Sequence, residues 1–490
     1  MAAGYHDRIL DVDLTKGTTS IREPGETYFR SHYGGWGMIA HELLNSGAAK
    51  LEPFDPGNPL IFAAGVLTGA PLPGTGRHAV GAKSPLTGSF GEADVGGFWG
   101  AELKKAGLDG IVITGKANRP VYLWIHDGDV EIRDARNLWG RLTADVEMAI
   151  REELGDSQVR VAQCGPAGEN LVRYACVMHD VARAAGRCGL GAVMGSKNLK
   201  AVAVRGTGDI PMANPEKVKE LSETLNTFIR ENYANFTEHG TSGNITRLHE
   251  AGQLPTRNFQ KATFEGYAKI CGRRMTEEHL DGRDTCFACP VACKRRAKAS
   301  GKYNVEPAYG GPEYESVAAL GSICEVDDLE AILYANQLCN AYGLDTISTG
   351  VTIAWSMEAF DRGLLTPEDT GDLEIRFGDA EIMVRLVEMI AKREGFGALL
   401  ARAAYERRGR SAETRKRSPS SPAVKKPPCT TLGSSSPLAS ATRHRRPVPT
   451  TCTTSTTRDM RTTLSWAVSR CSASTRKRLH TTISARRRSD

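Results

Sequence analysis

Three cysteines stand close together in the run Cys286-Phe-Ala-Cys289-Pro-Val-Ala-Cys293. Spacings of three and four residues bring their thiolates to one side of a single turn, which is typical of ligands for an iron–sulfur cluster or a zinc ion. Either centre normally takes four ligands, and the next cysteines, Cys324 and Cys339, lie in apolar helical sequence. We therefore expect the fourth ligand to come from a distant part of the chain.

Arginines accompany two of the glycine-rich turns. Arg77 follows Gly74-Thr-Gly, while Arg183 and Arg187 lie beside and within the run that begins at Gly186. Glycine turns alone are usually structural, but backbone amides and guanidinium groups together bind phosphates. The glycine spacing departs from the dinucleotide fingerprint, and no lysine completes a phosphate-binding loop. The turns indicate an anionic cofactor with several phosphates, without identifying it.

Hydrophobic patterning divides the chain into a β-rich first part and a helical second part. Short β-type runs bounded by Gly, Pro or Lys occur at 9–14, 60–64, 110–114 and 201–204. From Asn214 onward the periodicity is helical, most clearly over 327–343, where Asp327 is the expected N-cap and Gly343 the expected end. The pattern predicts an α+β fold, with a β-rich domain over 1–210 and a helical domain over 211–410.

Residues 411–490 differ in composition from everything before them. They contain 17 Lys and Arg against 3 Asp and Glu, one Gly, and neither Phe nor Tyr. Such a stretch suits a disordered basic tail or an RNA-binding arm. Translation in a shifted frame fits better, because skipping two bases in a possible coding sequence for 448–456 restores Ala-Asn-Tyr-Leu-His-Asp-Phe-Tyr. We therefore expect a disordered, frameshifted tail whose charge has no functional meaning.

Composition also bears on the compartment. No apolar run reaches the roughly 18 residues that a membrane span needs, and the opening Met-Ala-Ala-Gly-Tyr-His-Asp lacks the features of a signal peptide. Nine cysteines precede residue 411, an odd number gathered as ligands, which favours a reducing compartment over a disulfide framework. We expect a cytoplasmic protein that binds neither a membrane nor nucleic acid.

Seven motifs follow one another through the first two parts of the chain: LTGAPLPGTGR, GPAGEN, RAAGRCGLGAVMGSKNLKA, LPTRNFQ, CFACPVAC, GPEYE and YGLDTIS. Together they resemble the aldehyde:ferredoxin oxidoreductases, tungsten or molybdenum enzymes that carry two pterin ligands and one 4Fe–4S cluster. The cofactor-bearing subunit of the tungsten-dependent benzoyl-CoA reductases shares this ancestry and remains an alternative.

The resemblance implies a β-rich base on which the two pterins lie, with helical domains closing over them. The pterin phosphates, bridged by Mg²⁺, would meet residues of the glycine turns: Arg77, Gly96, Arg183, Ala184, Gly186 and Arg187. A family D-x-x-G-L-D motif that binds a pterin corresponds to the segment containing Asn340, Gly343, Leu344 and Asp345.

The resemblance also assigns the metal and catalytic residues. Cys286, Cys289 and Cys293 would be cluster ligands. One glutamate of GPEYE, either Glu313 or Glu315, would lie near the metal as the catalytic carboxylate, and the other would be an N-terminal helix charge. Cys164, Cys176, Cys271 and Cys339 are expected to be buried small hydrophobes. Cys324 is also a candidate for the pocket because it is close to GPEYE in the sequence.

Several positions depart from the family pattern. Asn340 stands where Asp is usual, Asp94 stands beside a pterin where Asn is usual, and Cys188 interrupts an expected Gly-Gly pair. The family's fourth cluster cysteine, a second pterin-binding aspartate motif and an active-site histidine belong to a third domain. We assign no ligand among the cysteines after residue 410 and expect the chain as given to be inactive.

These implications lead to one expected activity. The parent reaction is the oxidation of a small aldehyde to a carboxylic acid at a bis-pterin tungsten or molybdenum centre. Electrons pass through the 4Fe–4S cluster to ferredoxin or another low-potential carrier, with a homodimer or electron-transfer subunits as further partners. Zinc in the cysteine run and a basic RNA-binding protein resting on the tail are the competing interpretations.

Overall fold

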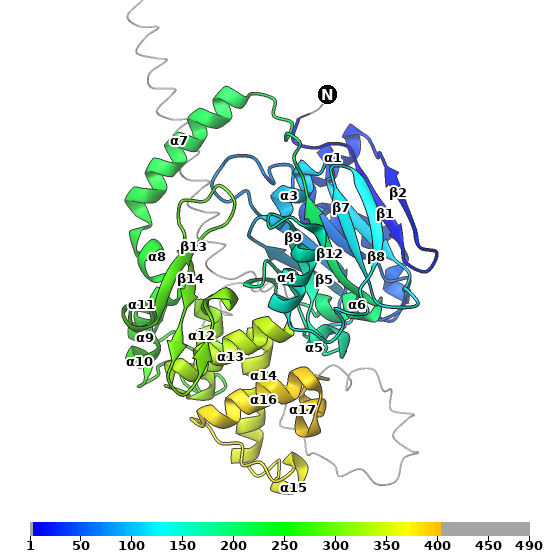
Figure 1. Cartoon of the computed structure of the whole chain (residues 1–490). Helices are drawn as coiled ribbons and strands as arrows, with labels where there is room; N and C mark the ends of the chain where they lie inside the picture. Colours follow the sequence, from blue (N-terminus) through cyan, green and yellow to red (C-terminus); the bar gives the residue numbers. More distant parts are fainter. Residues whose placement is uncertain (1–2, 403–490) are drawn as a thin grey trace, which may run out of the picture. The chain divides into compact units, whose positions relative to one another are not determined.

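The computed structural model describes residues 3–402. The predicted disordered tail, with its cysteines, lies outside the described residues. Strands fill the first half of the described chain and helices the second, which confirms the α+β class (Figure 1). The predicted domain boundary near residue 210 stays a prediction. In the described part of the chain, no helix is long and apolar enough to cross a membrane.

The first half is built on two six-stranded sheets. The order of the first sheet is β2 (Thr18–Arg22), β1 (Ile9–Asp13), β6 (Gly110–Thr114), β3 (Leu60–Ala64), β4 (His78–Lys83) and β5 (Phe90–Val95). The order of the second is β11 (Arg183–Ala185), β10 (Val177–His179), β9 (Arg160–Cys164), β12 (Leu199–Arg205), β7 (Val121–His126) and β8 (Asp129–Asp134). The pairs β1–β6 and β7–β12 are parallel and the others are antiparallel. All four predicted β-type runs are strands.

Hydrophobic residues of both sheets meet in one shared core. Leu60 and Phe62 of β3 pack in the same cluster as Leu123 of β7 and Val202 of β12. Trp99 of α3 (Trp99–Lys105) is fully buried there, and its indole nitrogen donates to the Val202 carbonyl at 3.0 Å. The inner faces of the two sheets are apolar, and burying them against each other removes them from water. This core therefore fixes the two sheets against each other.

Helices cover the outer faces of the two sheets. The apolar sides of α1 (Glu26–His32) and α2 (Gly35–Asn45) pack on the first sheet, and α4 (Thr143–Leu154) packs on the second. Two shorter helices, α5 (Pro166–Glu169) and α6 (Leu190–Ser196), contact each other, and α6 also packs in the shared core.

The second half contains the helices α7 (Pro215–Asn232), α8 (Ala234–His239), α9 (Asn244–Glu250), α10 (Tyr267–Ile270), α11 (Gly272–Glu278), α12 (Tyr314–Leu320), α13 (Leu329–Tyr342), α14 (Thr346–Asp361), α15 (Pro367–Thr370), α16 (Ala380–Lys392) and α17 (Gly395–Leu400). Short 3-10 helices are η1 (Ala48–Lys50) in the first half and η2 (Thr241–Gly243), η3 (Pro307–Tyr309) and η4 (Ser322–Cys324) in the second. Two small hairpins, β13 (Leu280–Asp284) with β14 (Lys294–Ala297) and β15 (Ala299–Ser300) with β16 (Asn304–Val305), separate α11 from α12.

The predicted helix over 327–343 is α13, with one correction at its start. Asp328, not Asp327, is the N-cap, and its side chain accepts from the Ala331 amide at 3.1 Å. Asp327 instead forms an ion pair with Lys269 at 2.6 Å. Gly343 ends the helix at φ 76, as predicted.

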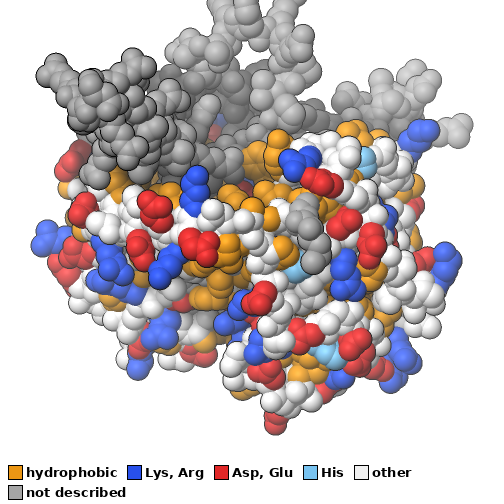
Figure 2. Space-filling model, turned by 90° about the horizontal axis from the view of Figure 1, so that it is seen from above, with side chains coloured by type: hydrophobic (Ala, Val, Ile, Leu, Met, Phe, Trp, Pro, Cys, Tyr) orange, Lys and Arg blue, Asp and Glu red, His pale blue; other side chains and the backbone are white. Residues whose placement is uncertain are grey.

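The helical half packs directly on the first half. The hydroxyl of Tyr174 donates to the Leu400 carbonyl at 3.1 Å, and Thr143 donates from its hydroxyl to the Asn340 carbonyl at 2.9 Å. On the face seen in Figure 2, acidic and basic side chains are interspersed among hydrophobic ones and not gathered by sign.

Candidate functional site

The predicted ligand cysteines occupy the loop between β13 and β14. All three thiols are free and half-buried. Arg295 of β14 is 2% exposed and anchors the loop, because its guanidinium donates to the Ala292 carbonyl at 2.6 Å and the Glu238 carbonyl at 2.7 Å. Nothing in the amino-acid pattern indicates this role, since one arginine in a basic run is usually a surface charge.

The three thiols lie close enough to influence one another. Burial raises the pKa of Cys293 to about 12, and Glu313, Cys286 and Cys289 add to this shift. Burial also raises the pKa of Cys289. Within residues 3–402, no three His, Cys, Asp or Glu side chains already stand in a metal-holding arrangement. Thiolate donors suit a thiophilic centre such as an iron–sulfur cluster. Three thiols alone leave the ligand set of such a centre incomplete.

The cysteine loop rests on a glycine pair that follows β5. The Phe287 amide donates to the Gly97 carbonyl at 3.0 Å. A Cβ atom at Gly96 would come within 2.8 Å of the Cys286 sulfur, so a larger residue here would displace that sulfur. The structure thus brings Gly96, a predicted phosphate-binding position, against a predicted cluster ligand.

Arg183 of β11, in the second sheet, contacts the start of the cysteine loop. Its guanidinium donates to Asp284 at 2.9 Å and to the Thr285 carbonyl, directly before Cys286. Burial alone would raise the pKa of Asp284, but Arg183 holds that pKa below its ordinary value. Ala184 is paired with Met178 in the β10–β11 ladder.

A second group of predicted residues surrounds Arg187. Its guanidinium lies 3.6 Å from the carboxylate of Asp345, which is 3% exposed and caps α14 through the Ile347 amide at 2.9 Å. Burial raises the pKa of Glu315, and Arg187 opposes that shift. At Gly186, the preceding residue, an added Cβ atom would meet only ordinary contacts, the nearest at 3.6 Å.

The two glutamates of GPEYE face different groups. Glu313 is the N-cap residue of α12, accepts from the Thr241 hydroxyl and lies 3.5 Å from Lys294. Its charge adds to the raised pKa of Cys293, so it belongs to the cysteine-loop side. Glu315 belongs to the Arg187 side. This division distinguishes two residues that the sequence leaves equivalent.

The first residues of the predicted pterin-binding segment, Asn340 to Leu344, contact other parts of the protein. The Asn340 amide donates to the Tyr309 carbonyl at 2.8 Å, and Leu344 bridges to Ala175 of the first half. A Cβ atom at Gly343 would come within 2.8 Å of the Gly165 amide nitrogen, so this glycine is required for close packing as well as for its φ of 76. Asp345 is thus the member of this segment that meets another predicted site residue.

The structure shows the contacts of two residues that depart from the family pattern, Asp94 and Cys188. Asp94 accepts from the Trp36 indole at 3.2 Å, a contact between residues 58 positions apart. Cys188 has φ 68, a left-handed conformation that explains why glycine is expected there. Its thiol donates to the Glu92 carbonyl at 3.6 Å.

Cys324 is not a pocket residue, which corrects one of the two expectations for it. It is fully buried in the core of the helical half, where its thiol donates to the carbonyls of Ala319 at 3.3 Å and Gly350 at 3.5 Å. Cys164, Cys176, Cys271 and Cys339 are buried, as predicted.

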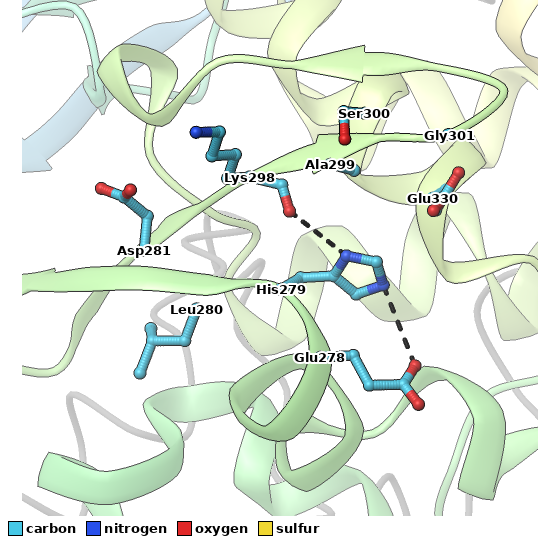
Figure 3. Close-up of a pocket in the computed structure, with 9 residues that line it drawn as sticks. All are labelled: Glu278, His279, Leu280, Asp281, Lys298, Ala299, Ser300, Gly301 and Glu330. Carbon is cyan, nitrogen blue, oxygen red and sulfur yellow. Dashed lines mark hydrogen bonds and ion pairs between the residues drawn. The ribbon is translucent and has the colours of Figure 1, made fainter.

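A groove of about 500 Å³ lies elsewhere, beside β13 and β15 (Figure 3). It is lined by Glu278, His279, Leu280, Asp281, Lys298, Ala299, Ser300, Gly301 and Glu330. One imidazole nitrogen of His279 lies 3.3 Å from the Lys298 carbonyl and the other 4.0 Å from Glu278. The groove contains none of the predicted site residues.

Comparison with known proteins gives the family. Residues 9–206 match the model "Aldehyde ferredoxin oxidoreductase, N-terminal domain", and residues 219–424 match "Aldehyde ferredoxin oxidoreductase, domains 2 & 3". The chain is 45% identical over 411 residues to the tungsten-containing aldehyde ferredoxin oxidoreductase of Pyrococcus abyssi, covering 82% of this chain and 67% of that one. It is 42% identical over 409 residues to the protein of that name from Pyrococcus furiosus, covering 82% and 66%. The chain thus spans about two thirds of the length of these relatives.

A solved structure has the same fold. The active site complex BamBC of benzoyl coenzyme A reductase, bound to 1,5-dienoyl-CoA, aligns with a TM-score of 0.73 and 31% identity, covering 82% of this chain and 62% of that one. The resemblance inferred from the seven motifs is confirmed. This chain belongs to the aldehyde ferredoxin oxidoreductase family of oxidoreductases.

Proposed function

We propose that the enzyme oxidises small aldehydes to carboxylic acids and passes the electrons to ferredoxin or another low-potential carrier. Each aldehyde takes up one water and releases two electrons and two protons. The observation that carries the proposal is the contact of the cysteine loop with Gly96 and Arg183, because it joins the candidate cluster ligands to the candidate phosphate-binding residues.

The residues present fit a phosphate-bearing cofactor at this place. Arg77, Arg183 and Arg187 supply positive charge, and Gly96 lacks the Cβ that would close the approach to Cys286. These residues, with the backbone at Ala184 and Gly186, would hold the pterin phosphates and their Mg²⁺. A bis-pterin tungsten or molybdenum centre, when bound, accepts the two electrons that leave a hydrated aldehyde. Cys286, Cys289 and Cys293 would hold the 4Fe–4S cluster.

Glu315 is the carboxyl we assign to proton transfer. It is half-buried, and burial raises its pKa toward the range in which a carboxyl both takes and returns a proton near neutral pH. The positive charge of Arg187 limits the rise of the Glu315 pKa. Glu313 stabilises the start of α12 and the end of the cysteine loop.

Residues 411–490 bear on whether this chain is active. We propose that they result from a frameshift, on the ground of their composition. We place the shift between roughly codons 405 and 427, and the family match ends within this interval, at residue 424. A chain translated this way lacks the fourth cluster cysteine that the family resemblance places in a third domain, so we propose that it is inactive.

The test is to express the frame-corrected protein beside the 490-residue chain under anaerobic conditions with tungstate. We expect the corrected protein to contain tungsten or molybdenum, pterin and iron, and to reduce a viologen dye when aldehyde is added. The 490-residue chain should show no aldehyde-dependent dye reduction. Zinc without iron in the corrected protein would contradict the cluster assignment, and equal turnover by both proteins would contradict the inactivity of this chain.

A second candidate is the cofactor-bearing subunit of a benzoyl-CoA reductase. The likeness to the BamBC complex favours it. Dye-coupled turnover of 1,5-dienoyl-CoA by the corrected protein, with none for any of a panel of aldehydes, would select this candidate over the first. Gel filtration with multi-angle light scattering would distinguish a homodimer from a protein that awaits electron-transfer subunits.

A further inference from the structure

Two histidines form a hydrogen bond inside the core that the two sheets share. His78 begins β4 and His179 ends β10, and their Nε2 atoms lie 3.1 Å apart. Both side chains are buried among aromatic rings. Trp99 lies 4.7 Å from the His78 ring and 5.6 Å from the His179 ring, centroid to centroid. Burial lowers the pKa of His179 to about 3 and lowers that of His78 well below its ordinary value, so both imidazoles are neutral.

The surroundings fix which histidine donates. Nδ1 of His179 lies 3.3 Å from the Val177 carbonyl, which only accepts, so this nitrogen carries the proton. Nε2 of His179 is then an acceptor, and Nε2 of His78 must be the donor. Nδ1 of His78 becomes a buried acceptor, and it has no hydrogen-bond partner among the described residues. A Cβ atom at Gly100 would come within 2.7 Å of this nitrogen, so α3 leaves room for the ring only because it has glycine there.

The bonded pair joins β4 to β10, and the phosphate-binding candidates lie directly before or beside these two strands. His78 directly follows Arg77, and it is paired with Val95, the residue before Gly96. His179 is paired with Arg183 across the β10–β11 ladder. A single side-chain hydrogen bond therefore links the residue that follows Arg77 to the residue that is paired with Arg183.

We infer that His78 and His179 are positioning residues that hold Arg77 and Arg183 at the spacing a phosphate-bearing cofactor requires. This inference rests on the proposed function. Hydrophobic side chains would fill the same volume, but apolar contacts have no preferred direction. A hydrogen bond does, so it fixes the position of β4 relative to β10. The two arginines are then preorganised before the anion arrives.

The experiment compares replacements of His78 in the full 490-residue chain. His78→Leu removes the donor and keeps an apolar side chain, while His78→Gln retains an N–H near the position of Nε2. Arg77→Ala is the control for loss of the phosphate contact itself. Each variant is titrated with inorganic pyrophosphate and Mg²⁺ by calorimetry, and its thermal unfolding is recorded. Amide hydrogen exchange is followed for 177–185, with 9–22 as an internal control.

We expect His78→Leu to weaken pyrophosphate binding by about 10-fold or more. Residues that orient the groups binding an ion typically have effects of that size. Exchange over 177–185 should accelerate while exchange over 9–22 stays unchanged, and His78→Gln should restore both readouts. A His78→Leu protein that folds and retains wild-type exchange and binding overturns the inference, as does a His78→Gln protein that behaves like His78→Leu.

The two readouts separate this inference from the proposed function. If Arg77→Ala binds pyrophosphate as tightly as the wild-type chain, the assignment of Arg77 to phosphate binding fails. Unchanged exchange over 177–185 in His78→Leu would instead show that the histidine pair does not set the position of the β10–β11 hairpin. If His78→Leu does not fold, the His78→Gln protein decides the matter, because wild-type exchange and binding are expected of it.

Discussion

Glu313 and Glu315 are two positions apart in the sequence, yet their surroundings differ. Glu313 lies against Thr241 and Lys294, whereas the charge of Arg187 acts on Glu315. In the frame-corrected enzyme, we expect Glu315→Gln to lower aldehyde-dependent dye reduction by about 100-fold or more, because proton transfer by a positioned carboxyl contributes that much. Tungsten and iron contents should stay unchanged. Glu313→Gln is the matched control and should reduce turnover far less, because its carboxylate is held by Thr241 and Lys294. The reverse order of effects would assign the catalytic role to Glu313.

Glu147 gives a prediction about pH that does not depend on any cofactor. Burial raises its pKa to about 7, with Asp180 adding to the shift and Arg151 and Arg160 opposing it. The Glu147 carboxyl therefore binds a proton more tightly in the folded state than in the unfolded chain. The resulting stabilisation is complete below the ordinary pKa near 4.5 and is lost as the pH rises through about 7.

The measurement is urea unfolding of the wild-type chain and Glu147→Gln from pH 5 to pH 8. The wild-type free energy of unfolding should fall by about 2–3 kcal/mol more than that of the variant over this range. Parallel pH profiles for the two proteins would show that Glu147 stays ionised in the folded state despite its burial.

At the scale of elements, the β13–β14 hairpin depends on its contact with the glycine pair after β5. Gly96→Ala places a Cβ 2.8 Å from the Cys286 sulfur, so that sulfur must move away. In the frame-corrected protein we expect the variant to lose about half or more of its bound iron, since the displaced sulfur is a candidate cluster ligand and packing strain opposes its return. Gly65→Ala is the matched control, because its nearest contact is at 3.4 Å. Equal iron contents measured by a colorimetric iron assay would contradict the contact.

The elements also show how far the sequence could predict the structure. Short runs such as Leu60–Ala64 identify their strands because fully buried strands are continuously apolar. The choice of Asp327 over Asp328 as N-cap was wrong because the ion pair with Lys269, far away in sequence, engages the first carboxylate. Local patterns predict the existence of an element better than its first residue.

Contacts across the sheets could not be predicted in this way. The His78–His179 bond joins residues 101 positions apart, and neither histidine is marked by a motif of its own. The motif resemblance proposes the residues of the candidate site, but it leaves Glu313 and Glu315 equivalent. Their separation depends on which group each faces, and that is decided by the packing around the start of α12.

At the scale of the whole molecule, the two described halves form the parts of one candidate site, and the remaining question lies in the coding sequence. The first 410 residues have the composition of an enzyme, whereas 411–490 carry 17 basic and 3 acidic residues with neither Phe nor Tyr. A stretch so poor in large apolar side chains does not have the composition of a domain that positions metal ligands, because little apolar surface is available to offset the entropy of ordering it.

We therefore predict a lost or gained base between roughly codons 405 and 427, an interval that includes the end of the family match at residue 424. The alternative frame should run without a stop codon and encode a helical domain with a cysteine after an aspartate–glycine–leucine motif, which supplies the fourth ligand beside Cys286, Cys289 and Cys293. Resequencing the gene from its source is the measurement, and a chain joined in the alternative frame should bind iron that the 490-residue chain does not retain. Stop codons scattered through that frame would rule out the frameshift and return 411–490 to consideration as a genuine basic segment, with salt-dependent RNA retention as its next test.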